Sequence, residues 1–531
     1  MLADAFTARC RVRLSRDARR AWTHPAPTVK KHSTFKFAVS QHYWYQAFLD
    51  SLPIWGMVGE MEGSEEELEA LELKGEKEHE IHDVYIYTLK RLSIAYNGDS
   101  IIEVNLTSDR PVPAKAGQQV TFSYEVSWQP TNKEFAQRFT RYLDYSFFEH
   151  QIHWFSIFNS FMMVIFLCGL VALILVRALN NDYARFTRGD DDDAGGLESG
   201  GGIGDESGWK QVHGDAFRPP PYLVLLSACV GTGAQMAMLS FGVVLLAIAG
   251  SLYIDRGALV TSVLVVYAFT SIVAGFVSGS VFSKYDSAAS QAKSRWMRAM
   301  VLTATLFPGL VFAVASVLNV ISIYYATINV VPLGTFLAIV AIYLFVSWPL
   351  TVLGTVLGRH GGPPGDYFPC RVNALPRGVP PRSWFTHPLT IIALTGVLPF
   401  GAVFIEIFFI FSSIWSHKFY YVWGFLLLVM LILVVVSVCV TVVAVYFQLN
   451  SEDWRWPWTA FFASGSTALY VFFYGLYFFL FKTNMTGFVQ TVFYFAYLGL
   501  FCTALGLVCG AVGFLGAMVF VRRIFRNIKV D

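Results

Sequence analysis

A single acidic residue, Glu406, lies deep in an apolar stretch of the sequence, between Phe404-Ile405 and Ile407-Phe408-Phe409. An ionised carboxylate at the centre of a membrane helix costs roughly 2.5–3.5 kcal/mol on insertion scales, so it must face the protein, form a pair or stay protonated. One interpretation is a site that couples a proton or a substrate to transport. The other, which we favour, is a hydrogen bond between helices or a position nearer the membrane surface, because Trp415 and His417 follow soon after.

The remaining residues that could do chemistry form no recognised catalytic pattern. The sequence has no nucleophile elbow, phosphate-binding loop or His-Glu-x-x-His motif. His150 and His153 have a spacing that could ligate a metal, but no third ligand is near them, and we interpret them as polar residues at the membrane interface. Most of the seven cysteines fall in apolar stretches, where small packing residues are expected. We therefore expect no enzymatic activity, no cofactor and no bound metal.

The elements that would position these residues are membrane helices. The chain is 55% hydrophobic and 14% charged, whereas soluble domains have about 25% charged residues. A membrane-spanning helix needs roughly 20 apolar residues. About nine stretches reach that length, near 156–176, 223–249, 258–282, 299–325, 331–357, 388–412, 422–447, 459–481 and 488–521. A net charge of +2 without a long basic run argues against nucleic acid as a partner.

A polar, β-rich region precedes the first apolar stretch. Segments 84–96, 101–107 and 120–128 are rich in β-branched and aromatic residues, and Asn97-Gly98 is a hairpin-type turn signal. We expect a small antiparallel sandwich there. The fold class predicted for the whole chain is an all-α polytopic membrane bundle of nine transmembrane helices, preceded by a small β-rich lumenal domain.

The distribution of cations between the connecting segments predicts the orientation. By the positive-inside rule, the side richer in lysine and arginine is cytosolic. The segments reached after the first span hold most of these residues: Arg177, Arg185, Arg188, Lys210, Arg218, Lys284, Lys293, Arg295, Arg298, Arg359, Arg371, Arg377, Arg382, Arg455, Arg522, Arg523, Arg526 and Lys529. The opposite short loops hold only Arg256, Lys418 and Lys482. The β-rich domain is therefore expected in the lumen and the C-terminus in the cytosol.

These patterns together predict the domain boundaries. In chain order they are an atypical N-terminal segment at 1–34, the lumenal β-rich domain at 35–155, the first transmembrane helix at 156–177, an acidic glycine-rich cytosolic linker at 178–221, an eight-helix transmembrane bundle at 222–521 and a cytosolic tail at 522–531. Asn105-Leu106-Thr107 in the lumenal domain is a candidate glycosylation site. Asn484-Met485-Thr486 is expected to stay unmodified, because its hairpin lies tight against the membrane.

Several long and unusual blocks of the sequence carry a family resemblance. They are Phe-Phe-Glu-His-Gln-Ile-His-Trp-Phe-Ser-Ile-Phe-Asn-Ser-Phe-Met-Met-Val-Ile-Phe-Leu at 147–167, Asp-Tyr-Ala-Arg at 182–185, Gly-Trp-Lys-Gln-Val-His-Gly-Asp at 208–215, Phe-Pro-Cys-Arg-Val at 368–372, Leu-Pro-Phe-Gly at 398–401, Phe-Ile-Glu at 404–406, Asp-Trp-Arg-Trp at 453–456 and the tail from 520. With Tyr-Trp-Tyr-Gln at 43–46 and Leu-Pro-Ile-Trp-Gly at 52–56, they cover most of residues 35–531. In these blocks the chain resembles the nonaspanins, the transmembrane nine superfamily or endomembrane protein 70 family, and within it the member-three type.

The resemblance gives the tail and the glycines a functional interpretation. Family members end in Lys-x-Asp/Glu, which the COPI coat reads for Golgi retention, and Lys529 and Asp531 match that signal. On the residues alone, the same tail is an ordinary basic stop after a last span. The glycine pairs Gly275/Gly279, Gly354/Gly358 and Gly506/Gly510, continued by Gly513, allow helices to approach closely. Packing within the bundle is the simpler reading, and docking of client spans is the one that the resemblance suggests.

The resemblance implies a non-enzymatic function. The expected protein is a multi-pass protein of the Golgi or endosome membrane that assists the sorting and membrane localisation of other membrane proteins. Its expected partners are the COPI coat, client proteins with glycine-rich transmembrane helices, and the lipid bilayer. The alternative is a proton-coupled transporter or channel of endomembranes that uses Glu406.

Overall fold

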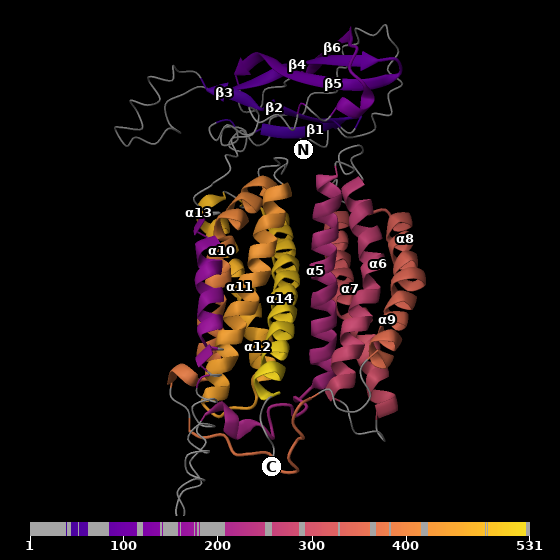
Figure 1. Ribbon diagram of the computed structural model, residues 1–531. Coiled ribbons are helices and arrows are strands. Elements are labelled where there is room, and N and C mark those ends of the chain that lie inside the picture. Colours follow the sequence, from indigo (N-terminus) through magenta and orange to yellow (C-terminus); the bar gives the residue numbers. More distant parts are fainter. Residues whose placement is uncertain are drawn as a thin grey trace, which may run out of the picture. The chain divides into compact units, whose positions relative to one another are not determined.

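The computed structural model (Figure 1) describes most of the two folded parts of the chain. The described residues are 39, 44–50, 52–61, 84–113, 121–138, 141, 158–159, 161–174, 176–177, 180, 208–249, 258–285, 292–325, 327, 330–361, 368–381, 384–415, 423–483, 485 and 487–526. The chain divides into two compact units. One contains Met1–His150 with Leu252–Ala258 and Ser416–Phe419, and the other contains the rest of the chain.

The first unit is built from β-strands. Strands β1 (Trp44–Leu49) and β2 (Leu52–Met57) form an antiparallel pair. In the second sheet β4 (Val84–Asn97) is central and pairs antiparallel with β3 (Gly59–Met61) and β5 (Ser100–Pro113). The predicted turn at Asn97-Gly98 connects β4 to β5, and Gly98 has φ 60°, in the region that favours glycine. A short 3₁₀ turn (Phe135–Gln137) follows the sheet.

The expectation of a wholly antiparallel sandwich is wrong for the last strand of this unit. Strand β6 (Ser123–Pro130) pairs parallel to β4, from Leu89↔Ser123 to Tyr96↔Pro130. Alternation of apolar residues predicts a strand but not its direction, because both directions of pairing place alternate side chains on one face. Strand β6 pairs with β4 and not with β5, so the neighbour that it follows in the sequence is not the neighbour that it pairs with.

Lys90 of β4 is an unusual interior residue of this unit. Its side chain is 5% exposed, and its ammonium donates to the Met57 carbonyl oxygen at 3.0 Å and to Ser108 Oγ at 2.8 Å. The Tyr45 ring lies 5.0 Å from the nitrogen. Desolvation by burial lowers the pKa of Lys90 from its ordinary 10.5 to about 8.

This buried lysine predicts that the β-rich unit becomes more stable above pH 8. Between about pH 8 and 10.5 the folded unit has released the Lys90 proton while the unfolded chain still holds it, so stability rises with pH. Below pH 8 both states are charged, and the contribution is constant. Hydrogen exchange of β4 in the full chain, corrected for the intrinsic rate, should show this rise. Lys90→Met should abolish it, whereas Lys133→Met, at a site more than half exposed, should keep it.

The second unit is helical. Its helices are α5 (Leu223–Ile248), α6 (Ala258–Tyr285), α7 (Ala292–Tyr324), α8 (Leu333–Ile342), α9 (Trp348–His360), α10 (Pro388–Trp415), α11 (Trp423–Asn450), α12 (Trp456–Gly465), α13 (Thr467–Lys482) and α14 (Phe488–Phe525). A π-helical turn, Tyr343–Ser347, joins α8 to α9, and a 3₁₀ turn, Trp384–Thr386, precedes α10. Helices α12 and α13 form one span with a break at Ser466.

The predicted class of polytopic helical membrane protein with a β-rich N-terminal region is confirmed. Within the described part of the chain, 8 helices are long and apolar enough to cross a membrane. A shorter apolar helix, Phe161–Ile174, lies within the predicted first span. Its Leu167 is buried among Ala402, Val436 and neighbouring residues of α10 and α11, which ties it to the bundle.

Helix α14 connects the two groups of helices that are visible in Figure 1, α5 to α9 and α10 to α13. It contacts α5, α11 and α12 more extensively than it contacts the other helices. At the contact with α5 a side chain on Gly233 would overlap the backbone of Leu507. In a membrane the hydrophobic effect does not drive helices together, because lipid tails are also apolar. Close backbone approach of this kind stabilises the pair through van der Waals contacts instead.

Two predicted boundaries differ from the structure. Residues 208–221 belong to the folded bundle and not to the linker, because Trp209, Val212 and Phe217 are buried in the main hydrophobic core. Helix α14 continues to Phe525, past the predicted end at 521. In both places the segment is polar on average, although some of its apolar residues pack between helix ends. Average polarity therefore does not predict that the segment is folded.

Candidate functional site

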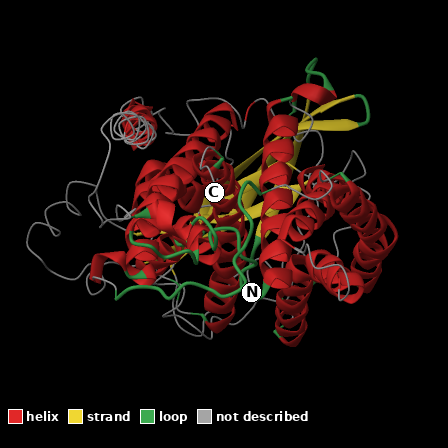
Figure 2. Cartoon of the chain, turned by 60° about the horizontal axis from the view of Figure 1, so that its bottom comes forward, coloured by secondary structure: helices red, strands yellow, loops and turns green. Residues whose placement is uncertain are grey.

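Three segments that are far apart in the sequence interlock at one end of the bundle. They are residues 208–221, which include the short 3₁₀ helix η4 (Trp209–Val212), residues 368–381 and residues 448–458; we call them the loop cluster. The loops drawn green around the mark C in Figure 2 belong to this end. Each segment contains one of the blocks on which the family resemblance depends, so the structure brings these blocks together.

Three tryptophans at and just before the start of α12 hold the other two segments in place. The indole N–H of Trp454 donates to the Arg377 carbonyl oxygen at 3.1 Å, that of Trp456 to the Ala216 oxygen at 2.7 Å and that of Trp458 to the Pro221 oxygen at 2.7 Å. Trp456 is fully buried. An indole has only a donor, and a buried one needs an acceptor. The backbone of the loop cluster provides those acceptors.

Asp215 is the polar centre of the loop cluster. Its carboxylate is 2% exposed. Oδ1 accepts hydrogen bonds from Arg218 Nε at 2.9 Å and Nη2 at 2.6 Å, and Oδ2 accepts one from the Arg377 backbone N–H at 3.1 Å. Arg218 also donates to the Asn373 carbonyl oxygen at 2.7 Å, while the Asn373 N–H donates to the Gly214 oxygen at 2.9 Å. This carboxylate thus fixes segment 368–381 against segment 208–221.

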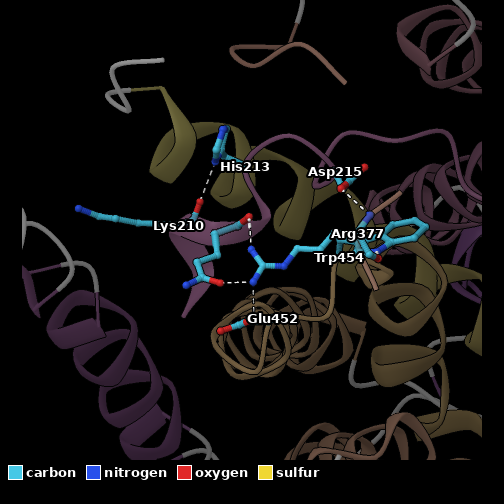
Figure 3. Close-up of polar contacts among 7 residues, drawn as sticks. Lys210, His213, Asp215, Arg377, Glu452 and Trp454 are labelled. Carbon is cyan, nitrogen blue, oxygen red and sulfur yellow. Dashed lines mark hydrogen bonds and ion pairs between the residues drawn. The ribbon is translucent and has the colours of Figure 1, made fainter. Parts of the chain in front are cut away.

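The Arg377 side chain links all three segments (Figure 3). Its guanidinium donates to the Gln211 carbonyl oxygen at 3.1 Å, to the Gln211 side chain, and to Glu452 Oε2 at 3.1 Å. Beside it, His213 Nδ1 lies 3.0 Å from the Lys210 carbonyl oxygen. Arg377 and Glu452 are partly exposed, so this pair is weaker than that of Asp215.

The acidic side chains of the loop cluster are all held by arginines. Asp453 accepts from Arg455 Nε at 3.2 Å and from Gln448 Nε2 at 3.1 Å, in addition to the pairs of Asp215 and Glu452. Carboxylates neutralised in this way suit a fixed scaffold better than acid–base chemistry. Among the described residues no group of three or more His, Cys, Asp or Glu could hold a metal ion.

The loop cluster also fixes the end of the last helix. Phe525 is 0% exposed and packs edge-on against Trp209, with ring centroids 5.3 Å apart, and against Phe217 at 5.7 Å. The Cys370 thiol points at the Phe525 carbonyl oxygen at 3.9 Å, and burial raises the pKa of this thiol. The candidate signal residues Lys529 and Asp531 lie outside the described residues, a few positions beyond this anchor.

Glu406 lies in α10 and is 4% exposed. Neighbouring residues of α10, Val403, Ile407 and Phe411, are buried in a cluster with residues of α11, α13 and α14. The carboxylate therefore faces the protein and not lipid, as expected for an acidic residue in a membrane helix.

The glycines of α6 and α9 face each other along one seam. A side chain on Gly279 would lie 2.5 Å from the Thr355 carbonyl oxygen. Side chains on Gly275, Gly354 or Gly358 would overlap backbone carbonyl oxygens of the facing helix. Each of these glycines thus contacts another helix of the same chain.

The glycines of α14 face α12, α13 and α11. A Cβ on Gly506 would lie 3.2 Å from Ala468 Cβ, one on Gly510 would lie 2.8 Å from the Phe461 ring, and one on Gly513 would lie 2.6 Å from Thr441 Oγ1. The surfaces of these glycines are therefore occupied within the bundle.

The remaining candidate residues lie in the β-rich unit or outside the described part. Asn105 is exposed on β5, and its Oδ1 accepts a hydrogen bond from Arg141 at 2.5 Å. His150, His153 and Asn484 lie outside the described residues.

The polar residues of the loop cluster were not recognised as a site from the sequence. Arg377, Gln211 and Asn373 contact residues up to 166 positions away, for which no local spacing gives a signal. The three family blocks could indicate this site from the sequence. All three fall in connecting segments on the same, cation-rich side of the predicted bundle, where they can meet.

Known proteins resemble this chain over most of its length. The family model for endomembrane protein 70 matches residues 10–488. Transmembrane 9 superfamily member 4 of Arabidopsis thaliana is 35% identical over 98% of this chain and 83% of its own length. Members 2 and 3 of the same plant are each 36% identical over 94% of this chain and 81% of their own length, so the member-three type is not separated from the others.

The human relative covers a smaller part. Transmembrane 9 superfamily member 4 of Homo sapiens is 37% identical over 80% of this chain and 64% of its own length. No solved structure matches the chain. From the family model and these identities, the chain belongs to the transmembrane 9 superfamily, the endomembrane protein 70 family.

Proposed function

We propose that this multi-pass protein resides in the Golgi or endosome membrane, assists the sorting and membrane localisation of other membrane proteins, and is retained by the COPI coat through Lys529 and Asp531. The observation that carries the proposal is membership of the family over most of the chain. The loop cluster supports it, because it packs against the end of α14, after which the proposed signal follows.

The distance in sequence between Phe525 and the proposed signal fits this role. Phe525 is buried and Arg526 is the last described residue, which leaves residues 527–531 beyond the anchor. At about 3.5 Å per residue, five extended residues reach about 17 Å. The proposed signal is therefore held near the bundle, and a coat subunit that binds it must approach the membrane closely. The side chains of Lys529 and Asp531 carry opposite charges that a complementary surface can recognise.

Replacing Lys529 and Asp531 together by alanine should move the protein out of the Golgi. The reason is loss of both charges that the coat would bind, and the measurement is imaging of the tagged full chain against a Golgi marker. The tail variant Val530→Ala keeps both charges and should stay in place. Unchanged Golgi residence of the double variant contradicts retention by this signal.

A transporter is the second candidate because Glu406 is an acidic residue buried inside a membrane bundle. In that case purified protein in liposomes should give a pH-dependent flux that Glu406→Gln abolishes. Glu60→Gln, at an acidic residue of the β-rich unit, is the matched control and should leave the flux unchanged. If the protein is a sorting factor, as we propose, neither the original chain nor the two variants should give a flux. Flux that depends on Glu406 would place transport ahead of sorting.

A further inference from the structure

Three helices end together at a corner of the bundle beside the loop cluster. Helix α6 ends at Tyr285, α9 ends at His360, and α7 begins at Ala292. The glycine seam holds α6 against α9, and the Tyr285 ring contacts Phe368 of the loop cluster with centroids 5.0 Å apart. The candidate spans Leu259–Tyr285, Arg295–Tyr324 and Leu333–His360 have their ends here, so the corner lies where a bilayer gives way to its headgroups. Figure 1 shows α6, α7 and α9 next to one another.

Exposed arginines gather at this corner. Arg295 and Arg298 lie in the first turns of α7, and Arg359 lies in the last turn of α9; all are exposed. The Arg359 guanidinium lies over the Trp296 ring, 5.0 Å from its centroid, which holds it in place. We call Arg295, Arg298 and Arg359 the arginine corner.

The arginine corner differs from the loop cluster in how its charge is balanced. In the loop cluster Arg218, Arg377 and Arg455 are each paired with a carboxylate, whereas Arg371 is exposed and has no ion pair among the described residues. Within the described part of the chain the arginine corner has no ion pair, and α6, α7, α8 and α9 contain no aspartate or glutamate; Asp286, directly after α6, lies outside the described residues. The positive-inside rule explains cations on this side. What is particular to the corner is that its arginines lie together on facing helix ends, with Arg359 held over the Trp296 ring.

We propose that the arginine corner binds the headgroup of a phosphoinositide, a phospholipid that carries a phosphomonoester in addition to its phosphodiester. Guanidinium groups bind phosphate oxygens through paired N–H donors, and three of them match a headgroup with more than one phosphate. A position at the membrane boundary suits a lipid ligand, and the stacked Arg359 is already ordered. The inference rests on the proposed function in one respect, the cytosolic orientation of this end.

Binding of a fluorescent short-chain phosphatidylinositol 4-phosphate to the full chain in detergent micelles tests the site. Each cation near a headgroup contributes about fivefold in affinity, so replacing Arg295, Arg298 and Arg359 by glutamine should weaken binding by about 100-fold. The charge-matched control replaces Arg371, Arg523 and Arg526, which are exposed at the same end, and should keep the original affinity. The triple lysine variant of the corner should bind within about tenfold of the original.

Three comparisons decide the outcome. Phosphatidylserine with the same chains should bind much more weakly, and equal binding of both lipids overturns the phosphoinositide assignment. Equal loss in the corner variant and the control variant means that bulk charge attracts the lipid, and overturns the site. Free glycerophosphoinositol phosphate that binds as well as the lipid shows a soluble-phosphate site instead. The variants change exposed residues, and size-exclusion profiles check that they fold.

Orientation is measured separately, so the two proposals can fail independently. Protease treatment of sealed vesicles should remove a tag at the C-terminus. A protected tag would overturn the proposed orientation and retention signal, while binding in micelles would still establish the arginine corner. An exposed tag with no lipid binding overturns the corner alone.

Discussion

Replacing Gly354 by valine should separate α6 from α9 and strongly destabilise the bundle. A side chain at this position would overlap the Ile272 backbone carbonyl oxygen, which cannot move without displacing the helix. Overpacking of a close contact costs about 1–3 kcal/mol, and more when backbone must shift. We expect a loss of about 3 kcal/mol or more, measured as a lower midpoint of thermal unfolding of the full chain in detergent.

The control for this variant is Gly499→Val. Gly499 lies in the interior of α14, and a side chain there would meet nothing within 4 Å. It removes a helical glycine in the same way without crowding a neighbour, so its midpoint should change little. If both variants unfold at the same temperature, the seam between α6 and α9 is not a source of stability.

Replacing Asp215 by alanine should release segment 368–381 from the bundle. The change removes the carboxylate that pairs with Arg218 and accepts from the Arg377 backbone N–H, and it leaves Arg218 only the Asn373 carbonyl oxygen. Removing one member of a buried ion pair costs about 3–5 kcal/mol, because the remaining charge is not compensated. Hydrogen exchange of residues 371–381 should rise sharply, and the thermal midpoint of the full chain should fall.

Glu452→Gln is the control for Asp215→Ala, because it breaks an ion pair of the same loop cluster that is more exposed. The Glu452–Arg377 pair is 3.1 Å long but partly exposed, with 24% and 41% of the side chains accessible. Exposed pairs contribute about 0.2–1 kcal/mol, so this change should have a small effect. If the thermal midpoint falls by a similar amount in both variants, Asp215 is not the central residue of the loop cluster.

Eight of the nine predicted spans correspond to long apolar helices of the described chain, because each depends on a local property, and the first corresponds in part to the shorter helix Phe161–Ile174. A helix that crosses a membrane must satisfy its own backbone hydrogen bonds and expose apolar side chains, so composition over roughly 20 residues identifies it. The break at Ser466 and the π-helical turn at Tyr343–Ser347 were not expected. Both depend on how a helix fits its neighbours, as where Ser466 Oγ donates to the Ile392 carbonyl oxygen at 2.7 Å.

Residues 208–221 show why the boundary of the linker was misplaced. Lys210, His213 and Asp215 give the segment a polar character typical of a loop, and the glycine-rich stretch before it extends that impression. Trp209 and Phe217 nevertheless pack against Phe525 at the far end of the chain. Composition reports how polar a segment is, not which of its side chains find a partner.

The sequence by itself determined the membrane class, the approximate spans, the β-rich region and the family, because these follow from local composition and from blocks of residues. Only the tertiary structure decided which glycines are occupied, that β6 runs parallel to β4, and that Asp215 binds the backbone of Arg377, 162 positions away. Contacts of that kind depend on which helices and strands become neighbours in space. That arrangement is a property of the whole chain and leaves no periodic signal in any one segment.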